Sequence, residues 1–271
     1  MPVSPSRSRG PKAAPPAERP RTLWPLVLIG IAAVSAVIIA TLPASLIVHF
    51  LPPFVHAEDF SGSVWHGSAG KLIVNARDAG ALEWRLHPRA LLGLAMAADL
   101  HWVKTGFELD GTVRMDRREI AADHIQGEGP IEDLRDFGVP AGWRGTVSIK
   151  SIEIKSDYSS ILSAAGDIQV TNLASARVAG GANLGGYDLS FPQDAISPDG
   201  TATANLADRG GPLQILALIR LSAKTRTATL SGTVMARAEA SPAVCSELDN
   251  LSQLRGRDSQ GRIPLEVEFT F

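Results

Sequence analysis

The sequence predicts a mainly β protein, in which one transmembrane helix near the N-terminus precedes an antiparallel β-sheet domain with a few short helices. Three observations support this prediction. Residues 22–57 contain no Asp, Glu, Lys or Arg. After residue 60, apolar residues alternate with polar ones, which is the period of a β-strand with one buried face. Short clusters of turn-forming residues separate the alternating segments, as β-hairpins require.

The composition is that of a globular protein. The chain has 271 residues, of which 45% are hydrophobic and 20% are charged, and its formal net charge is −2. Basic residues predominate in residues 1–22, so the rest of the chain is acidic. An acidic body argues against nucleic-acid binding, because phosphate contacts require a basic face. We therefore expect no nucleic-acid partner.

Residues 1–21 are predicted to be a disordered basic arm. This segment consists mostly of Pro, Ser, Ala and Arg. Such a composition buries too little apolar surface to offset the entropy lost on ordering.

Residues 22–43 are predicted to form a transmembrane helix. The apolar run at residues 23–42 has 20 residues, and at about 1.5 Å per residue it spans about 30 Å, the thickness of one hydrocarbon core. The alternative is a cleaved signal peptide, whose apolar region would be about 7–15 residues long and would end at a small-residue cleavage site. The greater length of this run, and the lack of a convincing cleavage site, favour an uncleaved anchor.

The charges that flank this helix predict its orientation. Basic residues precede the helix, and Glu58 and Asp59 follow its exit. By the positive-inside rule, the N-terminus lies in the cytoplasm. Residues 44–271 then form a β-rich domain on the outer side of the membrane.

The predicted strands are clearest at the C-terminus. In residues 263–271, IPLEVEFTF, every second side chain is apolar. We expect this strand to join the sheet, with Val267 and Phe269 packed into its apolar face. Residues 82–87, 107–115 and 228–240 alternate in the same way.

A short phrase, Gly-Ser-Val or Gly-Thr-Val, begins at residues 62, 111, 145 and 232. Its irregular spacing excludes a solenoid repeat. It is typical of hairpins in which a Gly forms the turn or bulge and the two residues after it begin the next strand. The first copy lies in SGSVWHG, residues 61–67, which could be a catalytic loop, a ligand cradle or the first hairpin. Alternation of its side chains favours an early strand with a glycine at each end.

Helices are predicted at residues 87–95, 130–138, 156–166 and 241–256. The last is the longest, with Ser241 as its N-cap and Gly256 as its stop. The one cysteine, Cys245, lies beside the apolar stripe of this helix, so we expect a buried, inert thiol. No internal disulfide is possible.

The sequence offers little for catalysis. The six histidines do not have metal-binding spacing, and no nucleophile or phosphate-binding motif occurs. The four tryptophans of the body are expected to be packing anchors rather than a binding site: Trp65, Trp84, Trp102 and Trp143. We therefore predict a protein that is not an enzyme, with no catalytic, cofactor-binding or metal-ligating residues and no cofactor, and we identify no small-molecule substrate.

The order of several motifs resembles a known family. After the anchor come LPASLIVHFLP, FSGSVWHGSAGKL, GALEWRLHPRALLGL and ADLHWVKTGFELDGTVRM, and near the end come LSGTVMARAEASP and LRGRDSQGRIPLEVEFTF. The set is similar to protein N of the type II secretion system, with the best match at residues 42–115 and 228–271. The most specific pieces are G-S-V-W-x-G, W-R-L-x-P-x-A-L-L and D-x-Q-G-R.

The resemblance implies a non-enzymatic, single-pass protein of the cell inner membrane with a periplasmic domain. It implies a role in exporting folded periplasmic proteins across the outer membrane, with other inner-membrane and periplasmic components of the apparatus as partners and the lipid bilayer around the anchor. The family is also distantly similar to curved-sheet proteins that carry lipids across bacterial envelopes. A lipid-handling envelope protein with an apolar groove on a curved antiparallel sheet is therefore the alternative, and an enzyme would need a polar pocket with convergent titratable groups.

Overall fold

The computed structural model describes residues 31–270 except positions 32, 36, 52, 92, 138, 158–159, 193–195, 198–199, 223 and 226. The chain divides into two compact units, Met1–Thr41 and Leu42–Phe271. The predicted basic arm and the first part of the predicted transmembrane helix lie outside the described residues. In the first unit the described positions from Ile31 to Ala40 are helical, and their apolar side chains are exposed. Among the described residues, no helix combines the length and the apolar character needed to cross a membrane.

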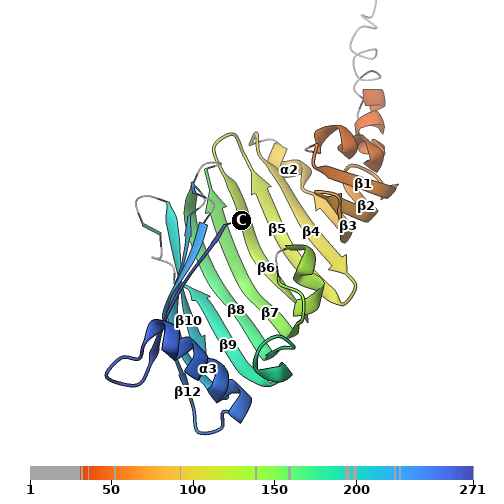
Figure 1. Ribbon diagram of the computed structural model, residues 1–271. Coiled ribbons are helices and arrows are strands. Elements are labelled where there is room, and N and C mark those ends of the chain that lie inside the picture. The colour runs from red at the N-terminus through yellow and green to blue at the C-terminus, as the bar shows by residue number, and fades with distance from the viewer. Residues whose placement is uncertain are drawn as a thin grey trace, which may run out of the picture. The chain divides into compact units, whose positions relative to one another are not determined.

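The second unit is built on one sheet of 13 strands, each hydrogen-bonded to the next in chain order (Figure 1). All neighbouring strands are antiparallel. The strands are β1 (Val55–Gly62), β2 (His66–Val74), β3 (Arg77–Leu86), β4 (Met96–Lys104), β5 (Phe107–Met115), β6 (Ile120–Pro130), β7 (Trp143–Ser156), β8 (Ile161–Ser175), β9 (Asn183–Phe191), β10 (Thr201–Asp208), β11 (Leu213–Ser222), β12 (Thr227–Ala236) and β13 (Ile263–Thr270). The predicted mainly β, antiparallel architecture is confirmed, and the sheet bends along its length (Figure 1).

The helical elements are few and short, as predicted. In the described part of the second unit, four are single turns or 3₁₀ segments and one is an α-helix of 14 residues: η1 (Ala44–Phe50), α2 (Pro88–Leu91), η2 (Ile131–Phe137), η3 (Ala179–Gly181) and α3 (Pro242–Arg255). In α3 the Ser241 hydroxyl accepts a hydrogen bond from the Val244 backbone N–H at 3.3 Å, and Gly256 ends the helix. The predicted caps of this helix are therefore confirmed.

One row of cross-strand partners runs through the whole sheet without a polar residue. It takes one residue from each strand: Phe60, Ala69, Leu82, Trp102, Leu109, Gly127, Ile149, Ile168, Leu189, Leu206, Ala217, Gly232 and Leu265. We call this set the apolar row, and the side of the sheet that carries it the apolar face. Side chains alternate between the faces, and we call the opposite side, which carries most of the charged side chains of β1–β5, the polar face.

Two clusters of buried side chains cover the apolar face near its two ends. On β1–β4, Ala44 of η1 packs with Ala69 and Trp84. On β9, β12 and β13, α3 and η3 pack with strand residues, and the buried members are Ala179, Leu184, Val234, Val244, Leu248 and Ile263. Between the clusters, members of the apolar row such as Ile149, Ile168 and Leu189 are only half-buried.

Two predicted segments have a different structure. In SGSVWHG the chain turns rather than extends: β1 ends at Gly62, whose φ is +82°, and the Ser63 N–H donates to the His66 carbonyl at 2.8 Å. This is the first hairpin turn, and Trp84 closes over it from β3 by donating to the Val64 carbonyl at 2.9 Å. The predicted early strand at 61–67 was therefore wrong, because alternation over four residues does not distinguish a strand from a turn.

The predicted helix at residues 156–166 was also wrong. Ser160 donates its backbone N–H to the Asp157 carboxylate at 2.7 Å, and this contact closes the hairpin between β7 and β8. The Asp157 side chain therefore stabilises the turn instead of capping a helix. Residues 161–166 form the start of β8. The segments predicted as helices at 87–95 and 130–138 are only the single turn α2 and the 3₁₀ helix η2.

The C-terminal strand forms as predicted, but its burial differs from the prediction. Ile263 is 1% exposed, whereas Val267 is 39% and Phe269 is 55% exposed. α3 packs near the start of β13 and does not cover its end. The expected packing of Val267 and Phe269 into the apolar face is therefore corrected: both lie on that face, at a part of it that is open.

Candidate functional site

The polar face of β1–β5 carries a ladder of polar side chains in register. One row of partners reads Ser61, Ser68, Glu83, His101, Asp110 and Gln126 across β1–β6. The adjacent row reads His66, Arg85, Asp99 and Thr112 across β2–β5. Opposite charges thus lie on neighbouring strands, an arrangement that stabilises antiparallel pairs.

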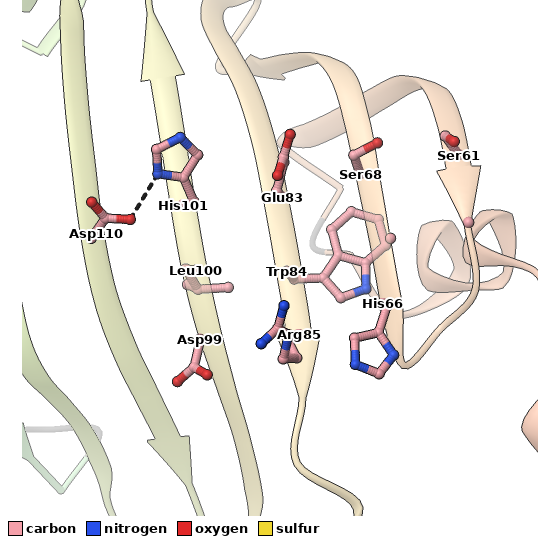
Figure 2. A pocket seen from close by; sticks show the side chains of 12 residues that line it. Ser61, His66, Ser68, Glu83, Trp84, Arg85, Asp99, Leu100, His101 and Asp110 are labelled. Atoms are coloured by element: carbon pink, nitrogen blue, oxygen red, sulfur yellow. Dashed lines mark hydrogen bonds and ion pairs between the residues drawn. The ribbon is translucent and has the colours of Figure 1, made fainter.

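Two histidine–aspartate contacts order this ladder, and Figure 2 shows the one between His101 and Asp110. His101 Nδ1 lies 2.7 Å from Asp110 Oδ1, across the tight turn that joins β4 and β5. His87 Nε2 lies 2.9 Å from Asp99 Oδ2, and the Thr112 hydroxyl donates to the other oxygen of Asp99 at 3.0 Å. Both pairs are about half exposed to solvent.

These contacts change the pKa values of two groups in opposite directions. The hydrogen bond to Asp110 raises the pKa of His101 above 6.5, with support from the negative charges of Asp110 and Glu83. The hydrogen bond from His87 lowers the pKa of Asp99 below 3.8, with a further contribution from Thr112. The contact with Asp110 therefore favours the protonated form of His101, and the contacts with His87 and Thr112 favour the ionised form of Asp99.

A depression of about 440 Å³ lies over this ladder, with Ser68, Glu83, Arg85 and His101 among its lining residues (Figure 2). A serine, threonine or cysteine nucleophile activated by histidine would need its hydroxyl or thiol within hydrogen-bond reach of the imidazole. In the described part of the chain, neither His87 nor His101 has a hydrogen bond to such a group. The described residues also contain no cluster of three or more His, Cys, Asp or Glu side chains that could hold a metal ion. The arrangement suits reversible contacts with polar groups.

The second candidate surface is the part of the apolar face along one side of the sheet, where the strands are joined by the turns opposite η2 and α3. In this antiparallel sheet, the odd-numbered strands end on the same side as the even-numbered strands begin. Several exposed apolar side chains lie on this side: Leu91, Leu94, Met96, Met115, Ile154, Leu162, Val267 and Phe269. The longer helical elements η2 and α3 lie at the opposite ends of the strands. Concentrations of exposed apolar side chains mark contact surfaces in soluble domains.

Three of the four tryptophans predicted as packing anchors lie in packed positions. Trp84 is buried, Trp102 packs against Phe107 with ring centroids 5.6 Å apart, and Trp143 packs on the α3 cluster, so their role as packing anchors is confirmed. Cys245 is half-buried, with its Sγ 4.0 Å from the Ala240 carbonyl, and so is less enclosed than expected. The His101–Asp110 pair was missed, although the turn at residues 105–106 would have indicated it, because that turn brings these two positions opposite each other.

Comparisons with known proteins give one match. No curated protein and no solved structure matches the chain significantly. A family model described as "Type II secretion system (T2SS), protein N" matches residues 53–266. The match begins just before β1 and ends within β13, so it includes nearly all of the 13-stranded sheet. The chain therefore belongs to the type II secretion system protein N family.

Proposed function

We propose that this protein is a non-enzymatic component of the type II secretion system that supports export of folded periplasmic proteins across the outer membrane. The observation that carries the proposal is the family match over residues 53–266, which spans almost the whole sheet. Membership implies the cell envelope and a structural role in secretion. Residues 22–43 anchor the chain in the inner membrane, the basic arm at 1–21 lies in the cytoplasm, and residues 44–271 lie in the periplasm.

The side chains of the sheet support a structural role over a catalytic one. The polar ladder has paired histidines and carboxylates, but its hydrogen bonds are satisfied by strand neighbours. Both pairs lie on an exposed sheet face, where water weakens the electrostatic effects that enzymes use. A continuous sheet with an acidic surface fits a protein that holds partners in position.

Two experiments test the proposal. The first is affinity purification of the tagged full-length chain from detergent-solubilised membranes, in which other inner-membrane components of the apparatus should be recovered. An unrelated single-span protein with the same tag is the control, and equal recovery with both would reject a specific association. The second uses a reporter that is active only outside the cytoplasm. It should work when fused after Phe60 and fail when fused before Arg21, and the reverse pattern would reject the proposed topology.

A second candidate function is lipid handling, and the apolar row favours it. A face with no polar residue in one row across 13 strands provides a continuous path for an acyl chain, and the exposed apolar side chains at one end of the strands provide an opening. Under this candidate, phospholipid remains with the chain after gentle extraction and is detected by mass spectrometry. Lipid-free protein would reject it without affecting the role in secretion.

A further inference from the structure

The two outermost strands of the sheet differ in how their free edges are protected. β1 and β13 each have one neighbouring strand. On the β1 side, η1 packs on the strand, and Pro43 forms a bridge with Ser63 just after it. β13 pairs with β12 over eight residues without a register shift, so it is straight and regular up to Thr270. A regular free edge presents unpaired N–H and C=O groups to any extended chain.

Protection of β13 is limited to its first half. Pro264 has no N–H to offer, and the Arg255 guanidinium donates to the Glu266 carbonyl at 3.0 Å. Within the described residues, the main chain of 267–270 has no hydrogen bond outside its pairing with β12. The second half of the strand is therefore available for pairing.

The side chains of β13 determine which kind of partner strand fits beside it. On the apolar face, Val267 and Phe269 are exposed, since the sheet ends at β13 and α3 does not reach them. On the polar face, Glu266 and Glu268 lie opposite Ser231 and Thr229 of β12, which are uncharged. Neither glutamate forms an ion pair with a residue in the described part of the chain. Beyond the free edge of β13, neither the apolar pair Val267 and Phe269 nor the acidic pair Glu266 and Glu268 has a neighbouring strand to contact.

We propose that the outer edge of β13 binds an extended segment of a partner protein in which apolar residues alternate with Lys or Arg. The segment adds a fourteenth strand: its main chain pairs with residues 267–270, its apolar side chains continue the row of Val267 and Phe269, and its basic side chains lie beside Glu266 and Glu268. This rests on the proposed function in one respect, that the partner is another component of the secretion apparatus.

Charge disfavours a second copy of this chain as the occupant. Pairing β13 with β13 of another copy brings Glu266 and Glu268 beside the same residues on the same face, and like charges on neighbouring strands destabilise a pair. Pairing β13 with the β1 edge of another copy brings them toward Glu58 and Asp59, which are also acidic and exposed. A basic partner strand meets neither obstacle.

The test uses the full-length chain in detergent and two capped, fluorescein-labelled peptides. One has four lysines alternating with three valines, and the other has glutamates in place of the lysines. Fluorescence anisotropy should detect binding of the lysine peptide. Glu266→Lys with Glu268→Lys should weaken this binding by about tenfold, because two attractive cross-strand pairs become repulsive, and should create binding of the glutamate peptide.

A matched control separates pairing at this edge from general attraction to an acidic protein. Glu128→Lys with Glu153→Lys makes the same change of charge at two exposed residues of β6 and β7. This control should leave affinity for the lysine peptide nearly unchanged at physiological salt, where charges more than about 8 Å apart are screened. Hydrogen exchange of the amides of residues 267–270 should slow when the peptide binds.

Three results would overturn the proposal. The first is no binding of the lysine peptide, and the second is an equal loss of binding in the control variant. The third is a dimeric chain whose β13 amides are protected without peptide, because this would assign the edge to a second copy. Peptide binding does not depend on secretion. Failure here therefore rejects the edge site alone, whereas failure of the secretion tests rejects the proposed function and leaves the peptide result intact.

Discussion

Phe60 on β1 and Leu265 on β13 are the two ends of one uninterrupted row of cross-strand partners that takes an apolar residue from every strand of the sheet. Each strand pairs with the one before it in the chain, so twelve local pairings produce a continuous apolar face. The helical clusters cover the ends of this face, and its middle is half-buried.

The middle of the apolar row can be tested with adjacent residues on β8. Ile168→Lys places an ammonium group on the apolar face between Ile149 and Leu189, and we expect it to lower the free energy of unfolding by about 2–4 kcal/mol. Gln169→Lys, on the polar face opposite Asp188, should change it by less than about 0.5 kcal/mol. Urea unfolding of the full-length chain in detergent measures both. Equal effects would mean that the two faces do not differ in burial.

A partly buried ion pair between Asp208 and Arg237 connects the end of β10 to the end of β12. Asp208 is almost fully buried, and accepts hydrogen bonds from Arg237 at 2.6 Å and from the Ile215 backbone N–H at 3.0 Å. Asp208→Ala should therefore lower the free energy of unfolding by about 2–3 kcal/mol, since it leaves the Gly210 and Ile215 N–H groups without their acceptor and Arg237 without its ion pair. Asp249→Ala, which breaks an exposed pair with Arg257, should cost less than about 1 kcal/mol. Similar urea midpoints for the two variants would contradict a structural role for the partly buried pair.

The His101–Asp110 contact predicts a pH dependence of stability. Asp110 raises the pKa of His101 above 6.5 in the folded chain. The stabilisation is therefore fully present below pH 6.5 and is lost as the pH rises through the folded pKa. The difference in urea midpoint between the wild type and His101→Gln should be larger at pH 5.5 than at pH 8.5. In an Asp110→Asn background this dependence on pH should largely disappear, and its persistence would assign the effect to another group.

The two ends of β13 should respond differently to truncation. Ile263 is 1% exposed within the α3 cluster, so Ile263→Ala should cost about 2–5 kcal/mol. Phe269 is 55% exposed, so Phe269→Ala should cost less than about 1.5 kcal/mol. Thermal unfolding of the full-length chain compares them. A large effect of Phe269→Ala without any added partner would mean that the end of β13 is covered by the chain itself.

Much of the sheet was predictable because alternation of side chains is local. The segment ALEWRLH has Leu82, Trp84 and Leu86 on the more buried side and Glu83 and Arg85 on the exposed side, as its period of two predicts. The α3 helix was predictable because Ser241 and Gly256 are strong boundary signals. These features depend on residues close together in the chain.

The features that were not predictable depend on distant residues or on what covers a face. Residues 156–166 contain both helix-capping and turn-forming signals, and the pairing of β7 with β8 decides in favour of the turn. Phe269 has the pattern of a buried residue, but it is 55% exposed, and the described residues of α3 pack near the start of β13 instead. The His101–Asp110 contact was missed because alternation alone does not give the register, which the tight turn at residues 105–106 sets.

The measurement that most directly tests the central claim is secretion by a clean deletion strain. If the protein is a working component of the type II secretion system, enzymes exported by this route should accumulate in the periplasm of the deletion strain, and the full-length chain supplied in trans should return them to the medium. A cytoplasmic marker and a resident periplasmic protein control for leakage. Normal secretion in the deletion strain would contradict the claim.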